Sequence, residues 1–177
     1  KVVIQKGKET YTNDLVVEYD SKSLVSLADR KAQEAATKKM FNMSQALAYL
    51  VYTMDEYLKM AEQAKAKNPK AIDPMIKDFN KLKETLVVTK GDNYVGAAEP
   101  QLREKMTDLY AKVAQSYYKP NQAELSNMEA VESRFTTAKD DYKKLKDKYL
   151  PKLNSVLSKD KLQPIVLKTF EEYLQIP

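Results

Sequence analysis

The sequence predicts an all-α fold: an up-down four-helix bundle with two long and two short helices, an N-terminal β-hairpin and a short C-terminal amphipathic segment. Two long stretches, 26–67 and 122–158, repeat apolar residues in alternating steps of three and four, as one face of a helix requires. Only three of the 177 residues are Gly, and Leu, Ala, Lys and Glu are abundant, which favours helix over sheet.

Residues 1–20 have a β pattern instead. We expect a first strand over 2–5 and a second over 9–19, joined by a turn at Gly7. Because an isolated two-stranded hairpin is marginal in water, we expect this one to pack on the helices and to be the remnant of a linker sheet from an upstream domain. The chain then divides into a hairpin and a helical bundle over 24–177.

The first helix is expected to begin at Ser26, with Asp29 completing a capping-box-like start, and to end at Asn68, because Pro69 disfavours helix in the residue before it. A helix of this length, roughly 60 Å, is not stable alone in water, so other helices must lie along it. Its apolar stripe comprises Ala36, Met40, Met43, Leu47, Leu50, Met54, Tyr57 and Ala61.

The second helix is expected over 74–89, with Lys70 as an earlier alternative start, and the third over 100–118. A loop over 90–99 separates them, since it holds two of the three glycines. The fourth helix is expected over 122–158, kinked or ended at Pro151. Its stripe comprises Met128, Val131, Phe135, Ala138, Tyr142, Leu145 and Tyr149.

The helix lengths suggest how the bundle is arranged. With short connections, the two long helices lie antiparallel, and the short helices, near 30 Å each, cover only half of their length. The uncovered halves leave an apolar trough near Ser26 and Leu157. We expect the hairpin and the segment after Pro164 to fill it.

The composition excludes most catalytic chemistry. Without His or Cys, the chain lacks the usual general base, thiol nucleophiles and imidazole ligands. We therefore predict no enzyme activity, no cofactor and no metal site. The net charge of +5 is almost entirely Lys, interspersed with acids, so we expect no nucleic-acid binding. No apolar run is long enough to span a membrane.

Two features are candidates for contacts with a ligand or partner. Tyr94, in the loop over 90–99, is the first; Tyr49, Tyr52, Tyr117 and Tyr118 extend it to an aromatic surface for sugar or peptide, unless they are ordinary bundle-edge tyrosines. The second candidate is the basic patch on the fourth helix, which fits an acidic partner and comprises Lys143, Lys144, Lys146, Lys148 and Lys152. Its alternative is a solvated helix face.

Two groups of short motifs resemble one family. Near the C-terminus these are the run Tyr149–Leu157 (YLPKLNSVL) and the step Leu162–Ile165 (LQPI); near the N-terminus they are Lys6–Thr12 and Leu15–Val17. They resemble the helical tail of secreted bacterial sortilin-like (BNR or Asp-box repeat) β-propeller proteins, often labelled glycosyl hydrolases. The resemblance implies a periplasmic or extracellular protein whose partner is an upstream β-propeller of the same polypeptide, with no catalytic residue in this chain.

On this basis we expect a non-catalytic accessory or interaction domain of an exported β-propeller protein. The first alternative is a wall or lid of a glycan- or peptide-processing site in the full-length protein. The second is a free-standing coiled-coil adaptor, which would need an apolar stripe left exposed.

Overall fold

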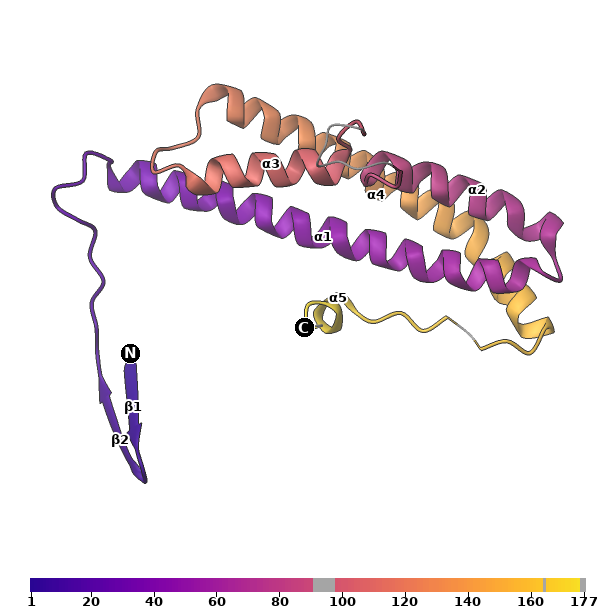
Figure 1. Ribbon diagram of the computed structural model, residues 1–177, viewed down its shortest axis with the longest axis horizontal. Helices are drawn as coiled ribbons and strands as arrows, with labels where there is room; N and C mark the ends of the chain where they lie inside the picture. Colours follow the sequence, from indigo (N-terminus) through magenta and orange to yellow (C-terminus); the bar gives the residue numbers. More distant parts are fainter. Residues whose placement is uncertain (91–97, 164, 176–177) are drawn as a thin grey trace.

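The computed structural model describes residues 1–90, 98–163 and 165–175. The chain is mostly helical, with an antiparallel two-stranded hairpin at its N-terminus (Figure 1). In chain order the elements are β1 (Val2–Lys6), β2 (Glu9–Asn13), α1 (Leu27–Lys65), α2 (Pro69–Leu86), α3 (Leu102–Gln115), α4 (Gln122–Lys159) and α5 (Phe170–Tyr173).

The start of α1 agrees with the prediction from the sequence, and its last residue, Lys65, lies three residues before the predicted end at Asn68. Ser26 is extended and its side chain accepts a hydrogen bond from the Asp29 backbone N–H (3.0 Å), which satisfies a donor that the first turn leaves free. Seven residues of the predicted stripe are buried, and the eighth, Met43, packs against the core. The predicted stripe of α4 is also buried or packs against the core, and the helix continues through Pro151.

The two short helices differ from the predicted bounds for local reasons. Pro69 occupies the first helical position, where its missing N–H costs nothing, so α2 begins there and accommodates Pro74 inside the helix. In α3 the helix ends early, because Ser116 is extended and its side chain accepts a hydrogen bond from the Tyr118 N–H (3.1 Å). This turn replaces the last residues of the predicted third helix.

The predicted direction of the long helices is wrong: α4 runs parallel to α1. Near their starts, Lys39 Nζ lies 2.6 Å from Glu132 Oε2, and at their ends the Asn68 side-chain amide donates to Asp160 (3.1 Å). The up-down-up-down order is therefore incorrect. α1 and α4 run in one direction, and α2 and α3 both run in the opposite direction.

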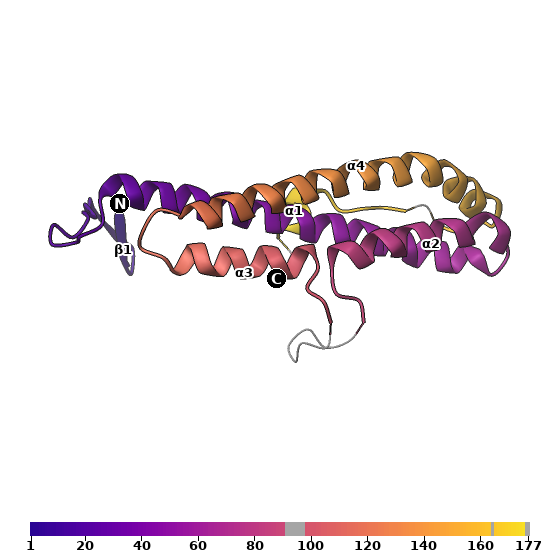
Figure 2. The ribbon, with the colours of Figure 1, turned by 90° about the horizontal axis from the view of Figure 1, so that it is seen from above.

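The reason is that α3 continues in the direction of α2. The Gln33 side chain, near the start of α1, donates to the carbonyl of Val113 at the end of α3 (2.9 Å), so the two short helices follow one another along α1 (Figure 2). At about 27 Å and 21 Å, they cover most of the roughly 58 Å of α1. Both halves of its apolar stripe are thereby buried, so the predicted uncovered trough does not form.

The C-terminal segment also lies elsewhere than predicted. Lys161 has a positive φ of 56° and the Leu162 N–H donates to the Leu157 carbonyl (2.9 Å), a Schellman-type end that turns the chain back along α1 and α4. The segment therefore starts beside Asn68, not near Ser26. The cause is the parallel course of α4, which places the ends of both long helices together.

The predicted hairpin forms, but its second strand ends at Asn13 instead of Tyr19, and it does not pack on the helices. Gly7 (φ 63°) provides the first central residue of its two-residue turn, and Ile4 pairs with Tyr11. All ten strand residues are exposed, and the hairpin projects away from the helices (Figure 1). The expectation that it fills a trough in the bundle is wrong, because the short helices already cover the core.

A polar link between α2 and α4 makes stability sensitive to acid. The Tyr149 hydroxyl donates to Asp78 (2.5 Å) and, with a smaller contribution from Lys148 at 3.2 Å, holds the pKa of that carboxyl below its ordinary value. A depressed carboxyl pKa stabilises the fold at neutral pH, and this contribution is lost as the pH falls below about 4.

We therefore expect Tyr149→Phe to lower the free energy of unfolding by about 1 kcal/mol at neutral pH, since the ring is kept and only the donor is lost. The difference from the wild type should narrow below about pH 4. Urea unfolding across this pH range measures it. A constant difference at all pH values would contradict the assignment.

Candidate functional site

Four aromatic rings gather where the C-terminal segment meets the middle of α1. Tyr49 and Tyr52 come from α1, and Phe170 and Tyr173 come from α5; we call these four the aromatic cluster. The centroid of the Tyr49 ring lies 5.3 Å from that of Phe170, and the centroid of Tyr52 lies 5.0 Å from that of Tyr173. These distances are typical of favourable aromatic pairs.

The C-terminal segment is held on α1 and α4 by this cluster and by its backbone. The Tyr49 hydroxyl donates to the Lys168 carbonyl (2.9 Å), and Leu167 packs against the core. The Thr169 side chain caps α5 by accepting from the Glu172 N–H (3.2 Å). The segment thus forms one wall of the hollows beside it.

The first hollow, which we call the Arg103 pocket, lies on the side of Tyr52 and Tyr173 and has a volume of about 330 Å³. Among the described residues that line it, one side chain is cationic, Arg103, and one is anionic, Asp55. Each already has a partner in the chain, since Arg103 pairs with buried Glu104 (2.8 Å) and Asp55 pairs with Lys83. Little charge is left for a ligand in this pocket.

The second hollow, which we call the α1–α4 groove, lies on the side of Tyr49 and Phe170 and has a volume of about 450 Å³. It is within the usual size range of small-molecule sites, roughly 300–1,000 Å³. Its lining is mostly apolar and aromatic, with two lysines at its edge. The residues that line it are Ala46, Tyr49, Leu50, Thr53, Tyr57, Phe135, Lys139, Tyr142, Lys146, Leu167 and Phe170.

Two hydroxyl groups of this groove form a short chain of hydrogen bonds. Tyr142 donates to the Thr53 hydroxyl (2.9 Å), which donates to the Leu50 carbonyl (2.8 Å). Burial raises the pKa of Tyr57 and, chiefly by the same effect, that of Tyr142. Both tyrosines are therefore neutral at physiological pH, and the lysines carry the charge of the groove.

The two lysines lie against the aromatic walls. Lys139 Nζ is 5.0 Å from the centre of the Phe135 ring, and Lys146 Nζ is 6.0 Å from that of Tyr142. Within the described part of the chain, neither forms an ion pair. With Lys143 between them, they occupy positions i, i+4 and i+7 of α4 and make a row along one face.

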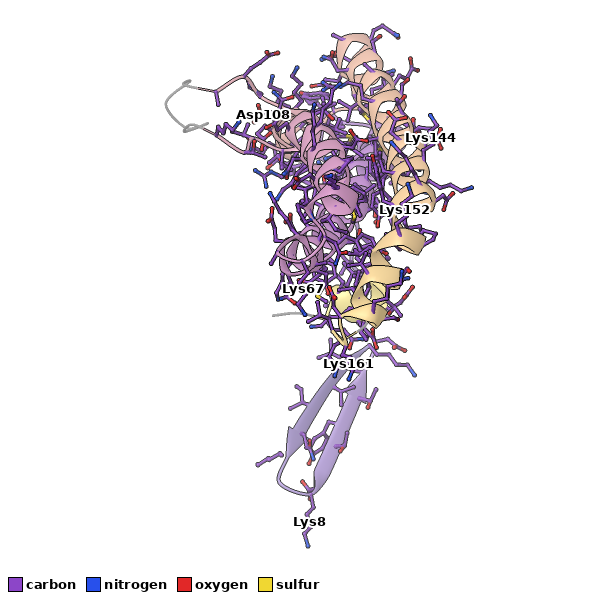
Figure 3. The ribbon with its side chains drawn as sticks, turned by 90° about the vertical axis from the view of Figure 1, so that its right-hand side faces the viewer. Lys8, Lys67, Asp108, Lys144, Lys152 and Lys161 are labelled. Atoms are coloured by element: carbon purple, nitrogen blue, oxygen red, sulfur yellow. The ribbon has the colours of Figure 1, made fainter. Side chains whose placement is uncertain are left out.

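The candidates taken from the sequence are only partly brought together. Tyr94 lies outside the described residues. Lys143 and Lys144 are exposed on α4, where Figure 3 labels Lys144. Lys144 pairs with Asp141 (3.0 Å). Tyr49 and Tyr52 do meet, whereas Tyr117 lies near the start of α1, with its ring under Arg30.

Phe170, Tyr173 and Lys139 were missed as candidates, whereas Lys146 belongs to the basic patch predicted from the sequence. Each of the two lysines follows an aromatic residue of α4, Phe135 or Tyr142, by four positions, and this spacing can be read from the sequence. The sequence does not show that the C-terminal segment returns along α4 and forms a groove beside these residues.

Comparisons with protein-family models, curated proteins and solved structures found no match for this chain. The resemblance to β-propeller tails therefore depends on the sequence motifs alone. None of the described helices combines the length and apolar character of a membrane span. In the described ranges, acidic side chains do not gather in threes that could hold a metal ion.

Proposed function

We propose that the chain is a non-catalytic helical module that binds the β-sheet of another protein domain through its N-terminal hairpin. The observation that carries this proposal is the exposure of the apolar side chains of the hairpin. Val2, Ile4 and Tyr11 share one face and are 42%, 61% and 55% exposed. A free hairpin of two strands is marginal in water, so a partner surface would stabilise it.

The apolar character continues beyond the second strand. Leu15, Val16 and Val17 are each more than 60% exposed in the chain that leads to α1. The outer edges of β1 and β2 also present backbone N–H and C=O groups that, within the described ranges, no third strand pairs. Open strand edges with apolar side chains favour strand addition to another sheet.

We further propose that this domain is the β-propeller of an exported bacterial protein, with the present chain as its accessory domain in the periplasm or outside the cell. This step is supported by the motifs at residues 6–17 and 149–165 and by the position of the hairpin. Burial of the α1 and α4 stripes inside the chain favours this module over a coiled-coil adaptor.

Site-specific photo-crosslinking in the native host tests the proposal. A photoreactive phenylalanine derivative at Tyr11 reports the apolar face, and the same group at Thr12 reports the opposite face of the same strand. We expect Tyr11 adducts that map to a β-strand of a propeller blade, and much weaker adducts from Thr12.

Two outcomes would contradict the proposal. One is adduct formation only with a second copy of this chain, and the other is an equal yield from Tyr11 and Thr12. A probe at Lys144, on the outer side of α4 in Figure 3, controls for non-specific capture.

A further inference from the structure

We propose that the α1–α4 groove binds a small anionic amphiphile, a single-chain carboxylate of the fatty-acid type, with its chain in the groove and its carboxylate at Lys139 and Lys146. This site is separate from the hairpin and does not depend on the function proposed above. Three properties of the groove support it: its walls, its charge and its opening to the surface.

The walls of the groove suit an apolar chain. Leu50 and Phe135 are buried on α1 and α4, and Leu167 and Phe170 from the C-terminal segment form the facing wall. The hydroxyls of Thr53 and Tyr142 are engaged with each other, so they do not demand a polar ligand. Burial of a hydrocarbon chain here would gain the usual hydrophobic free energy.

The charge at the edge of the groove suits an anion. Lys139 and Lys146 have no acidic residue three or four positions away on α4, and no ion pair in the described ranges. Their ammonium groups lie over aromatic walls that also face the hollow. The Arg103 pocket differs, because its arginine is already neutralised by Glu104.

The groove is open at its surface, because it lies on the side of α1 and α4 away from the short helices. Among the described residues, the segment 165–175 crosses it. This segment is held by the aromatic cluster, by the hydrogen bond from the Tyr49 hydroxyl to the Lys168 carbonyl and by the packing of Leu167. A ligand can therefore enter without opening the helical core, and a chain of about twelve carbons matches the scale of the hollow.

Titration of the full chain with dodecanoate below its micellar concentration, followed by isothermal calorimetry, tests the proposal. We expect one ligand per chain and about tenfold weaker binding when Lys139→Gln and Lys146→Gln are combined. The matched control combines Lys144→Gln with Lys152→Gln, which removes the same charge from the outer side of α4 (Figure 3). It should leave the affinity unchanged.

Two further arms distinguish the ligand chemistry. Dodecyltrimethylammonium has the same hydrocarbon chain with a positive head group, and we expect it not to bind. In the second arm, the circular dichroism signal of the helices should persist at the dodecanoate concentrations used, which shows that dodecanoate does not unfold the protein. Equal weakening by both lysine pairs, equal binding of the cationic amphiphile, or loss of helix on titration would overturn the proposal. So would binding to phosphatidylglycerol vesicles without binding of dodecanoate, which would indicate a membrane surface instead.

Discussion

Phe79→Ala is expected to lower the free energy of unfolding by about 3–5 kcal/mol, because it removes a whole ring from the centre of the core. Phe79 on α2 is fully buried and its ring contacts three tyrosines from two other helices. Its ring centre lies 6.2 Å from that of Tyr57, 6.3 Å from that of Tyr142 and 6.4 Å from that of Tyr149. Alanine would leave a cavity where α1, α2 and α4 meet.

Denaturant unfolding followed by circular dichroism measures this loss. The matched control is Phe41→Ala on α1, because Phe41 is 47% exposed and its ring has one close aromatic neighbour among the described residues, Tyr110. We expect the control to cost about 1 kcal/mol or less. Similar losses for the two variants would show that α2 does not pack between the long helices.

Ala61→Leu is expected to lower the free energy of unfolding by about 1–3 kcal/mol through overpacking. Ala61 is fully buried in the part of α1 that lies against α2. Ion pairs from Asp55 to Lys83 and from Lys65 to Asp73 fix the two helices on either side of it. A larger side chain must push the helices apart or leave its preferred rotamer.

The same substitution at Ala66 is the control, since Ala66 is exposed and follows the last residue of α1. Its effect should stay within about 0.5 kcal/mol. Thermal and denaturant unfolding of both variants give the comparison. If Ala61→Leu were as stable as Ala66→Leu, the close approach of α1 and α2 would be wrong.

The candidate site was predictable only in part. Tyr49 and Lys143 were identified as surface residues from their types; the structure places Tyr49 in the lining of the α1–α4 groove and Lys143 between its two lysines on α4. Phe170 and Tyr173 reach the rings of Tyr49 and Tyr52 because the C-terminal segment turns back at Lys161. The apolar periodicity of the sequence does not predict these contacts, because the residues that make them are far apart along the chain.

The sequence by itself determined the helices, their apolar faces and, to within three residues, the ends of the two long helices. These features depend on residues three or four positions apart, and on local signals such as Ser26 and Pro69. Tertiary structure alone decided that α3 continues the course of α2, that α4 is therefore parallel to α1, and that the hairpin stays apart. Those choices depend on which apolar stripes cover each other across the whole bundle, a condition that no short stretch of sequence contains.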